Sequence, residues 1–587
     1  MIQKIDSIII NIKKIISKKE GQKMKFKEFK YERPDFEVFK EILSKMTQEL
    51  KNADTSQAQI EKVKEIHHYI NTVMTEADIA TVRYTINTKD AFYEGESDYW
   101  DEYDPMYGEV INNFEAAMLD SPFRTELEEE FSKQYFDIME NSRLTFSPEI
   151  MEEMKQENKL VTEYNKLIAS AEIEFEGQTY NLSGLRPFMI SKDRETRKRA
   201  HEAYFSFFET HETKIDELFD KMVQIRDQKA KKLGFKDYVE FGYRLMNRND
   251  YNRDMVANYR KQVLEDIVPV ANELYARQAK RLGLDHLAYY DVDFEFNSGN
   301  AMPQGDSTFI LENGKKMYSE LSPETKEFFD FMTENELLDL ETKPGKQSGG
   351  YCTFFPAYKS PFIFSNFNGT AGDIDVLTHE AGHAFQVYQS RWIDVPELTF
   401  PTFESCEIHS MSMEFITWPW MENFFKQDTA KYKYEHLGSA IKFIPYGIIV
   451  DAFQHFVYEN PKATPAERKA HWRELEKQYL PHKDYSECEL LERGTWWYKQ
   501  GHIFASPFYY IDYTLAQVCA LQFWEKMNHD REAGWADYMR ICKSGGTKSF
   551  LQLVELANLK SPFEDGCIKS VIGEARNYLM GIDDSKL

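Results

Sequence analysis

Apolar residues recur at intervals of three and four along most of the chain, which is the spacing of helices with one buried face. The pattern is clearest in residues 36–50 and 60–86, where it predicts two long helices that pair as a hairpin. It continues over 147–171, 194–233 and 251–282. The chain is therefore expected to be mainly α.

Two stretches depart from this pattern. EIEFEGQTYNLSG alternates apolar and polar residues around Glu176 and Gly177, which predicts a short β-hairpin. Residues 345–370, GKQSGGYCTFFPAYKSPFIFSNFNGT, are rich in glycine, aromatic and turn residues and predict two short strands. Helical periodicity returns after residue 375.

These changes of pattern suggest how the chain is divided. Residues 1–23 are basic and carry no motif, so they are expected to form a poorly ordered extension, or to precede a start at Met24. Residues 24–200 are expected to form an N-terminal helical domain with the β-hairpin near its end. Residues 201–587 would form a second domain.

Charge and cysteine usage limit the classes of function. The 98 acidic residues outnumber the 72 basic ones and give a net charge of -26, which would repel a nucleic-acid backbone. The six cysteines form no CxxC pair and predict neither a zinc ribbon nor a disulfide framework. No convincing secretory signal and no uninterrupted apolar run of about 18 residues is found, so neither export nor a membrane span is expected. A cytoplasmic protein fits best.

The stretch VLTHEAGHAFQ carries the strongest chemical signal. His379 and His383 are four residues apart, so on a helix they lie on one face and can bind a single ion. Glu380 lies beside them, where a general base can take a proton from metal-bound water. About 0.03 accidental HExxH matches are expected among the chain's histidines. A zinc site is therefore favoured over two structural histidines.

Zinc in a catalytic site needs a third protein ligand and one open position. The downstream segment TFESCEIHSMSMEFITW has helical periodicity and carries Glu404, Glu407 and Glu414. Glu407 is the expected ligand, although a solvated surface carboxylate is the alternative reading. Glu414 lies two turns further on a similar face and is expected to orient a ligating imidazole.

Several motifs, in the same order along the chain, resemble the thimet-oligopeptidase-like zinc metallopeptidases, in particular the oligoendopeptidase F branch. They are HEAGHAFQ, the ExxSxxxE from Glu407 to Glu414, residues 349–370, GHIFASPFYYIDY, and SGGTKSF with the SPFEDG that follows. The resemblance implies two helical halves flanking a deep substrate channel, with a small β-sheet next to the zinc-binding helices. It makes residues 201–587 the catalytic domain.

The resemblance also implies roles for individual residues. His379, His383 and Glu407 would hold one Zn²⁺ per chain, with Glu380 as general base. His502, Tyr510 and Tyr513 would donate hydrogen bonds to the substrate or the oxyanion, and simple aromatic packing is the alternative for the tyrosines. His502 lies eight residues before Tyr510, where the thimet type has nine, so which tyrosine reaches the oxyanion stays open. The expected substrate-binding residues are Gly349, Gly350, Tyr351, Phe367, Asn368 and Tyr509.

Together these features predict a zinc endopeptidase that cleaves short unfolded oligopeptides. An edge strand within 351–368 could pair with an extended peptide backbone. Two alternatives stay open, an exopeptidase such as a dipeptidyl carboxypeptidase and a non-catalytic zinc-dependent peptide-binding protein. Glu380 argues against the second, because a pure binding site needs no base. Oligopeptides are the expected partners, not nucleic acid or membrane, and the oligomeric state is undetermined.

Overall fold

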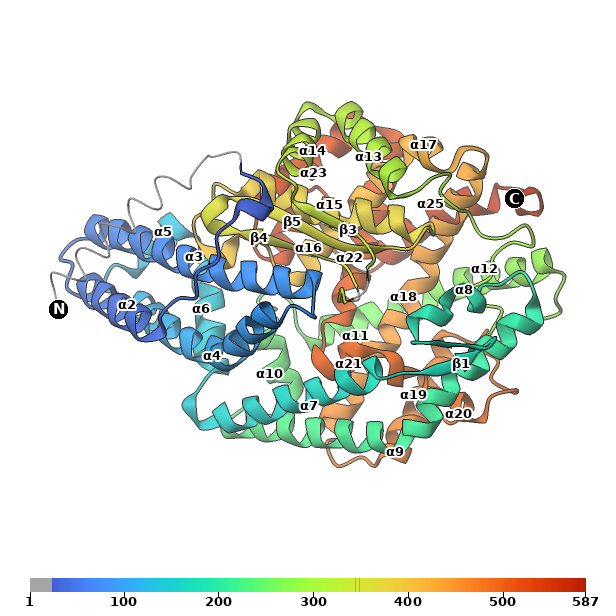
Figure 1. Cartoon of the computed structure of the whole chain (residues 1–587), viewed down its shortest axis with the longest axis horizontal. Coiled ribbons are helices and arrows are strands. Elements are labelled where there is room, and N and C mark those ends of the chain that lie inside the picture. Colours follow the sequence, from blue (N-terminus) through green and yellow to red (C-terminus); the bar gives the residue numbers. More distant parts are fainter. Residues whose placement is uncertain (1–23, 344, 348) are drawn as a thin grey trace. The chain divides into compact units, whose positions relative to one another are not determined.

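The structure is a computed structural model that describes residues 24–343, 345–347 and 349–587 (Figure 1). Helices make up 71% of it, and its sheets have two and three strands, so the prediction of a mainly α fold is confirmed. The extension expected at residues 1–23 lies outside the described residues.

The chain forms two compact units, each built from three separate segments. The first comprises the described part of Met1–Arg143, together with Met302–Lys426 and Lys526–Leu559. The second comprises Leu144–Ala301, Gln427–Glu525 and Lys560–Leu587. The linear division at residue 200 and the substrate channel stay predictions.

The first unit holds most of the N-terminal helices and the three-stranded sheet. Its helices are α2 (Phe36–Lys51), α3 (Ser56–Ile86), α4 (Ala91–Leu119), α5 (Arg124–Phe131), most of α6 (Lys133–Thr145), α13 (Ser307–Leu321), α14 (Pro323–Glu334), α15 (Gly372–Ser390), α16 (Phe403–Ile416), α17 (Glu422–Phe425), α23 (Arg531–Ser544) and α24 (Phe550–Leu556). Its strands are β3 (Leu338–Glu341), β4 (Tyr351–Phe355) and β5 (Ser360–Phe367).

The second unit is helical apart from one hairpin. Its helices are α7 (Met151–Ala169), α8 (Arg186–Met189), α9 (Arg194–Lys232), α10 (Tyr238–Leu245), α11 (Arg253–Gln262), α12 (Val268–Leu282), α18 (Thr429–Glu459), α19 (Pro465–Tyr479), α20 (Glu489–Glu492), α21 (Gly501–Ala505), most of α22 (Tyr510–His529) and α25 (Cys567–Met580). The hairpin strands are β1 (Ile173–Phe175) and β2 (Gln178–Tyr180).

Local signals explain where the predicted helices begin and which face they bury. The side chain of Asp35 accepts a hydrogen bond from the amide of Val38 and caps the N-terminus of α2. Phe39 and Leu43, four residues apart on α2, are fully buried in a core shared with α3 and α4. The long helices predicted for this region are therefore confirmed.

The predicted helix over 251–282 is interrupted. A single π-helical turn, Val263–Ile267, separates α11 from α12. Pro269, the second residue of α12, lacks the amide hydrogen that a regular α-helix would use there. The irregular turn accommodates the proline while the two segments stay continuous.

The sheet of the first unit has the strand order β3-β5-β4, and β4 pairs with β5 in antiparallel register. The two strands predicted between residues 345 and 370 are thus β4 and β5. The strand β3 was not predicted, and it pairs parallel to β5. Both β4 and β5 contact α15, so the small sheet lies next to the helix of the HExxH motif, which in turn packs on α16 (Figure 1).

The helices α15 and α16 pack very closely at Gly382. A Cβ atom at this position would lie 2.6 Å from both the His409 carbonyl oxygen and the Ser410 Cα. Only glycine therefore permits the observed contact between the two helix backbones. This contact brings the two motif segments together.

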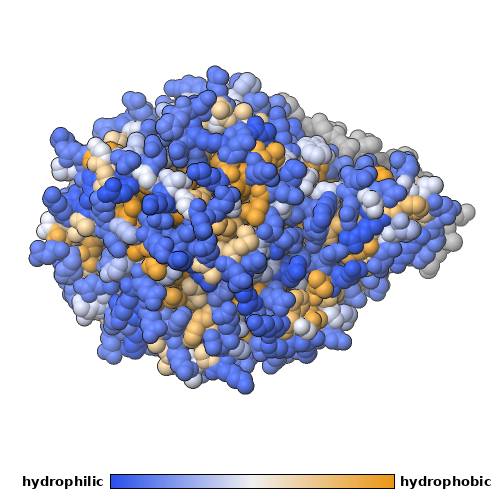
Figure 2. Space-filling model, turned by 180° about the vertical axis from the view of Figure 1, so that it is seen from behind, coloured by the Kyte–Doolittle hydropathy of each residue, from blue (hydrophilic) through white to orange (hydrophobic). Residues whose placement is uncertain are grey.

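One face of the molecule is covered mostly by hydrophilic residues, with hydrophobic residues interspersed among them (Figure 2). That surface agrees with the net charge of -26. Within the described part of the chain, no helix combines the length and apolar character that crossing a membrane requires.

The close contact at Gly382 generates a testable prediction. Gly382→Ala should lower the free energy of unfolding by about 3 kcal/mol, because a methyl group would collide with the α16 backbone. Urea unfolding followed by circular dichroism measures the change. Gly573→Ala in α25 is the matched control, since nothing lies within 4 Å of its added Cβ, and it should be neutral or stabilising by up to about 1 kcal/mol. Equal stability of both variants would contradict the packing argument.

Candidate metal centre and substrate-binding residues

The start of α15 is fixed by the turn that precedes it. Asp373 accepts hydrogen bonds from the backbone amides of Asn368, at 2.9 Å, and Gly369, at 2.7 Å. Gly369 has a φ of 86°, a left-handed conformation that favours glycine. This turn leads from β5 directly into the helix of the HExxH motif.

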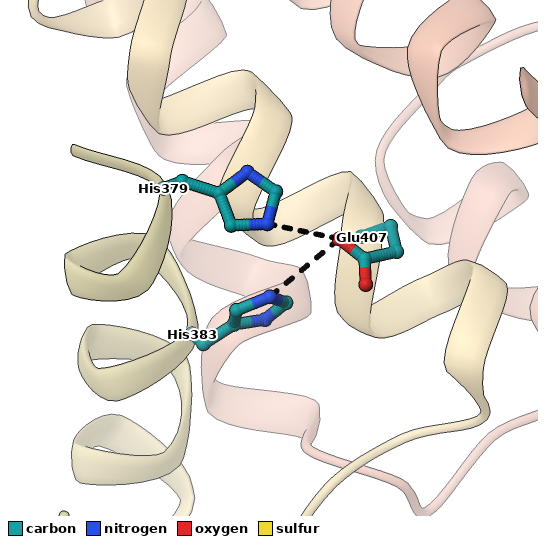
Figure 3. Close-up of side chains that lie close together, drawn as sticks. All are labelled: His379, His383 and Glu407. Carbon is teal, nitrogen blue, oxygen red and sulfur yellow. Dashed lines mark ion pairs between the residues drawn. The ribbon is translucent and has the colours of Figure 1, made fainter. Parts of the chain in front are cut away.

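His379 and His383 on α15 both face Glu407 on α16 (Figure 3). One carboxylate oxygen of Glu407 lies 3.2 Å from Nε2 of His379 and 3.5 Å from Nε2 of His383. One ligand atom from each residue lies within 4.8 Å of the others. The three residues that the sequence predicted as ligands therefore form one cluster.

The donor set and spacing fit a zinc ion. Two imidazoles and one carboxylate match the ligands of catalytic zinc sites, whose tetrahedral geometry places ligand atoms about 3.4 Å apart. Burial disfavours a charged imidazole, but hydrogen bonds to Glu407 and Glu414 outweigh it and raise the pKa of His379 well above its usual value. Burial also opposes the ionised carboxylate, yet His383 and His379 hold the pKa of Glu407 well below its usual value. The cluster thus stabilises positive charge beside Glu407.

Two further side chains orient these groups. Glu414, two turns along α16 from Glu407, has a carboxylate oxygen 2.7 Å from Nδ1 of His379. The Ser410 hydroxyl donates a hydrogen bond of 2.9 Å to the Glu407 oxygen that faces the histidines. Glu404 is buried on the same helix and lies outside the cluster.

Glu380 is buried, and Gly350 leaves space beside it. A Cβ atom at position 350 would lie 3.4 Å from Oε1 of Glu380, in van der Waals contact, so Gly350 lies directly beside this carboxylate. Burial raises the pKa of Glu380 above its usual value, partly offset by the nearby His379 and His383. The structure thus brings predicted substrate-binding Gly350 to the predicted base.

The other predicted substrate-binding residues of the first unit lie on or beside β4 and β5. Gly349 has a φ of 98°, and the Tyr351 ring stacks on Phe364 with centroids 4.8 Å apart. Phe367 is buried at the end of β5. Asn368 accepts hydrogen bonds from Thr370 in the following turn, so its side-chain oxygen has a structural partner.

The predicted histidine and tyrosines form a second group, in the second unit. The ring centroid of His502 lies 5.1 Å from that of Tyr510 and 5.8 Å from that of Tyr513. The Tyr513 hydroxyl is 3.5 Å from Nε2 of His502, and Tyr509 packs on Tyr513. Burial raises the pKa of Tyr510 above its usual value, so its hydroxyl stays a donor at neutral pH.

The segment that carries these tyrosines is held in a strained conformation. Phe508 has a φ of 68° and is fully buried. Its amide donates to Gln454 at 2.8 Å, and its carbonyl accepts from Arg248 at 2.6 Å. These contacts hold the backbone that directs Tyr509 and Tyr510.

Sequence reasoning missed two polar residues in this group. Gln500 contacts Nδ1 of His502 at 2.8 Å, and its side-chain oxygen accepts a hydrogen bond of 2.8 Å from Tyr446. Tyr446 lies on α18, more than fifty residues earlier, among apolar residues that gave no local signal. Gln500 stands only two residues before His502, which was the available clue.

The fold and the clustered donors agree with the comparisons with known proteins. Residues 26–146 match the Peptidase M3 N-terminal domain, and residues 188–571 match Peptidase family M3. The second match covers well over half of the chain. The chain therefore belongs to peptidase family M3, a family of metallopeptidases.

Individual relatives place it in the oligoendopeptidase F branch, which confirms the resemblance seen in the sequence. An oligoendopeptidase F homolog of Borreliella burgdorferi is 24% identical over 67% of this chain and 69% of that protein. The structure of PZ peptidase A with an inhibitor has a TM-score of 0.92 and 54% identity, over 96% of this chain and 100% of that one. A proposed oligoendopeptidase F of Bacillus anthracis has a TM-score of 0.89 and 51% identity, over 96% and 99%.

The contact between Glu414 and His379 generates the next prediction. Glu414→Ala should weaken zinc affinity by about 10- to 100-fold, because His379 loses the acceptor that orients it. Competition against a chromogenic chelator measures the affinity. Glu404→Ala is the control on the same helix, and its zinc affinity should stay within about threefold of the parent protein. Unchanged affinity in Glu414→Ala would show that the contact does not support the metal.

Proposed function

We propose that this peptidase is a zinc-dependent endopeptidase that hydrolyses internal bonds of short, unfolded oligopeptides. The observation that carries the proposal is the cluster of His379, His383 and Glu407, with ligand atoms within 4.8 Å of one another. Membership of family M3 supports it. The six free cysteines fit a reducing compartment, so we further propose that the enzyme acts in the cytoplasm.

In this proposal one Zn²⁺ per chain is held by His379, His383 and Glu407. The ion would supply Lewis acidity toward water and toward the peptide carbonyl. Glu414 holds the His379 ring through Nδ1, which leaves Nε2 directed at Glu407 and the ion. The Ser410 hydroxyl holds the Glu407 carboxylate by donating a hydrogen bond to it.

Glu380 acts as the general base. It follows His379 directly on α15, and its carboxylate is buried beside Gly350. It accepts the proton of the attacking water and passes it to the nitrogen of the leaving amine. Because Glu380 is not one of the three clustered donors, its proton transfer is separable from metal binding.

His502, Tyr510 and Tyr513 are proposed to donate hydrogen bonds to the substrate as negative charge develops on the carbonyl oxygen. One well-aimed donor of this kind contributes about 3–4 kcal/mol to transition-state stabilisation. The half-buried Tyr510 keeps its proton at neutral pH, which suits a donor. Gln500 contacts Nδ1 of His502 and so holds the ring in place, while Nε2 stays on the other side of the ring.

The β4 strand is proposed to bind the peptide backbone. It forms an edge of the three-stranded sheet, and Tyr351, Cys352 and Thr353 along it are only half-buried. A substrate that pairs with this edge is recognised by its main chain, so binding depends little on sequence. Gly349, Gly350, Phe367, Asn368 and Tyr509 are proposed to line the path of the substrate.

Because the proposed base Glu380 is not one of the proposed metal ligands, loss of the base can be tested separately from loss of the metal. Glu380→Gln should bind zinc like the parent protein yet lose at least about 100-fold in kcat, because only the proton acceptor has gone. Metal analysis and hydrolysis of a fluorogenic peptide measure the two properties. Removing zinc with a chelator should abolish hydrolysis in the parent protein, and added zinc should restore it. Full activity of Glu380→Gln would exclude this mechanism.

The proposed recognition of the substrate through its peptide backbone gives a second prediction. Peptides of about 7–15 residues that are acetylated and amidated should still be cleaved, because strand pairing needs neither a free amine nor a free carboxylate. Mass spectrometry of the products locates the cleaved bonds. The same peptides with free termini serve as controls. If either terminal block abolishes cleavage, the enzyme is an exopeptidase and the proposed metal chemistry is unaffected.

A further inference from the structure

Hydrogen bonds join Tyr446, Gln500 and His502 in a series within the second unit. The Tyr446 hydroxyl donates to Oε1 of Gln500 at 2.8 Å, and Nε2 of Gln500 lies 2.8 Å from Nδ1 of His502. On the other side of the imidazole ring, Nε2 of His502 has a longer contact of 3.5 Å with the Tyr513 hydroxyl. All four side chains are half-buried. The series therefore contacts His502 at both ring nitrogens.

The chemistry of each group gives this series a direction. An amide oxygen only accepts hydrogen bonds, and an amide nitrogen only donates them. Burial raises the pKa of Tyr446 well above its usual value, so the phenol keeps its hydrogen and donates it to Oε1 of Gln500. Nε2 of Gln500 then donates to Nδ1 of His502, which must be the nitrogen without a hydrogen. The hydrogen of the neutral imidazole therefore lies on Nε2.

Rotating the Gln500 amide by half a turn would reverse the series, and the surroundings of Tyr446 disfavour this. In the reversed series the amide nitrogen would donate to the Tyr446 oxygen, and the phenolic hydrogen would need another acceptor. Among the described residues, the Tyr446 hydroxyl makes no hydrogen bond other than the one to Gln500. Its ring meets the rings of Tyr510 and Trp472 edge to face, with centroids 5.8 and 6.3 Å away. The observed direction therefore satisfies the hydroxyl better.

The backbone holds both ends of the series. Gln500 stands between the short helix Trp496–Lys499 and α21, and its backbone amide and carbonyl hydrogen-bond to these two helices at 2.9 and 3.0 Å. Gly447, next to Tyr446 on α18, packs so closely on α22 that a Cβ there would collide with the Thr514 methyl group. The contact places Tyr446 beside the helix that carries the proposed substrate-binding tyrosines.

We propose that Gln500, itself held by Tyr446, is a positioning residue that keeps the hydrogen of His502 on Nε2 and so makes this nitrogen a donor to the substrate carbonyl oxygen. The inference rests on the proposed peptidase function and names the groups that set the tautomer of its histidine. Across the 3.5 Å contact, the Tyr513 oxygen faces the Nε2 hydrogen, so Tyr513 does not give its own hydrogen to His502. Both groups then present a hydrogen to the negative charge that develops.

Nitrogen-15 NMR of the zinc-loaded, histidine-labelled protein locates the ring hydrogen directly, with the His502 signals assigned by their loss in His502→Gln. At a pH of about 8, where an ordinary imidazole is neutral, the parent enzyme should show a hydrogen on Nε2 and none on Nδ1. Gln500→Glu has nearly the same shape but only accepts, so Nδ1 should gain a hydrogen. Tyr446→Phe leaves the Gln500 amide able to rotate and should give a mixture of both tautomers.

Peptide hydrolysis by the same variants shows whether the tautomer matters to the reaction. Gln500→Glu should lower kcat by about 100-fold and leave KM within about threefold, because the lost donor acts mainly as charge develops. Tyr446→Phe should lower kcat by about tenfold. Tyr479→Phe is the control, since it removes a hydroxyl that donates to the Arg260 carbonyl at 3.3 Å in the same unit, and it should change neither the tautomer nor kcat. Unfolding midpoints confirm that each variant is folded.

Three results would overturn the proposal. The first is a hydrogen on Nδ1 of His502 in the parent enzyme, and the second is a changed tautomer in Gln500→Glu with kcat unaffected. The third is a loss of kcat in Gln500→Glu with the parent tautomer retained, because the effect would then be structural. The tautomer is measured without turnover, so absence of zinc-dependent cleavage by the parent enzyme would refute the proposed function itself and leave the position of the ring hydrogen established.

Discussion

The contact between α15 and α16 at Gly382 is the constraint on which the candidate metal centre depends. The HExxH motif lies on one helix and Glu407 on the other, and side chains of this length meet only if the backbones come close. A Cβ at position 382 would be 2.6 Å from the neighbouring backbone, so the approach requires glycine. The sheet strands β4 and β5 pack on α15 and bring Gly350 to Glu380. Binding groups and base are thus organised around one helix.

Charge is arranged differently in the two units. Around the candidate metal centre, Glu407 and Glu414 supply negative charge that two imidazoles only partly balance, and the cluster is suited to a cation. In the second unit, the buried Arg248 is paired with the buried Asp512 at 2.8 Å. Buried or half-buried charge is costly unless it is paired. The imbalance at the candidate metal centre therefore indicates where a cation would stabilise the protein.

Periodicity was sufficient for most of the helices and failed where long-range or backbone effects intervened. The helices α2, α3, α7 and α9 could be predicted because each buries one face, and the β4 and β5 strands because turn residues bound them. The strand β3 was missed because four residues give too short a pattern and its partner β5 follows some twenty residues later. The π-helical turn at Val263–Ile267 was missed because periodicity does not register one extra residue in a turn.

The sequence by itself determined the family, the HExxH motif and the identity of Glu407 and Glu414 as candidates, because helical spacing fixes which side chains share a face. Only the tertiary structure decided that Glu414 reaches Nδ1 of His379 and that one oxygen of Glu407 faces both histidines. It alone placed Tyr446 beside Gln500. These contacts join residues whose separation in the chain follows no period, so packing between elements had to establish them.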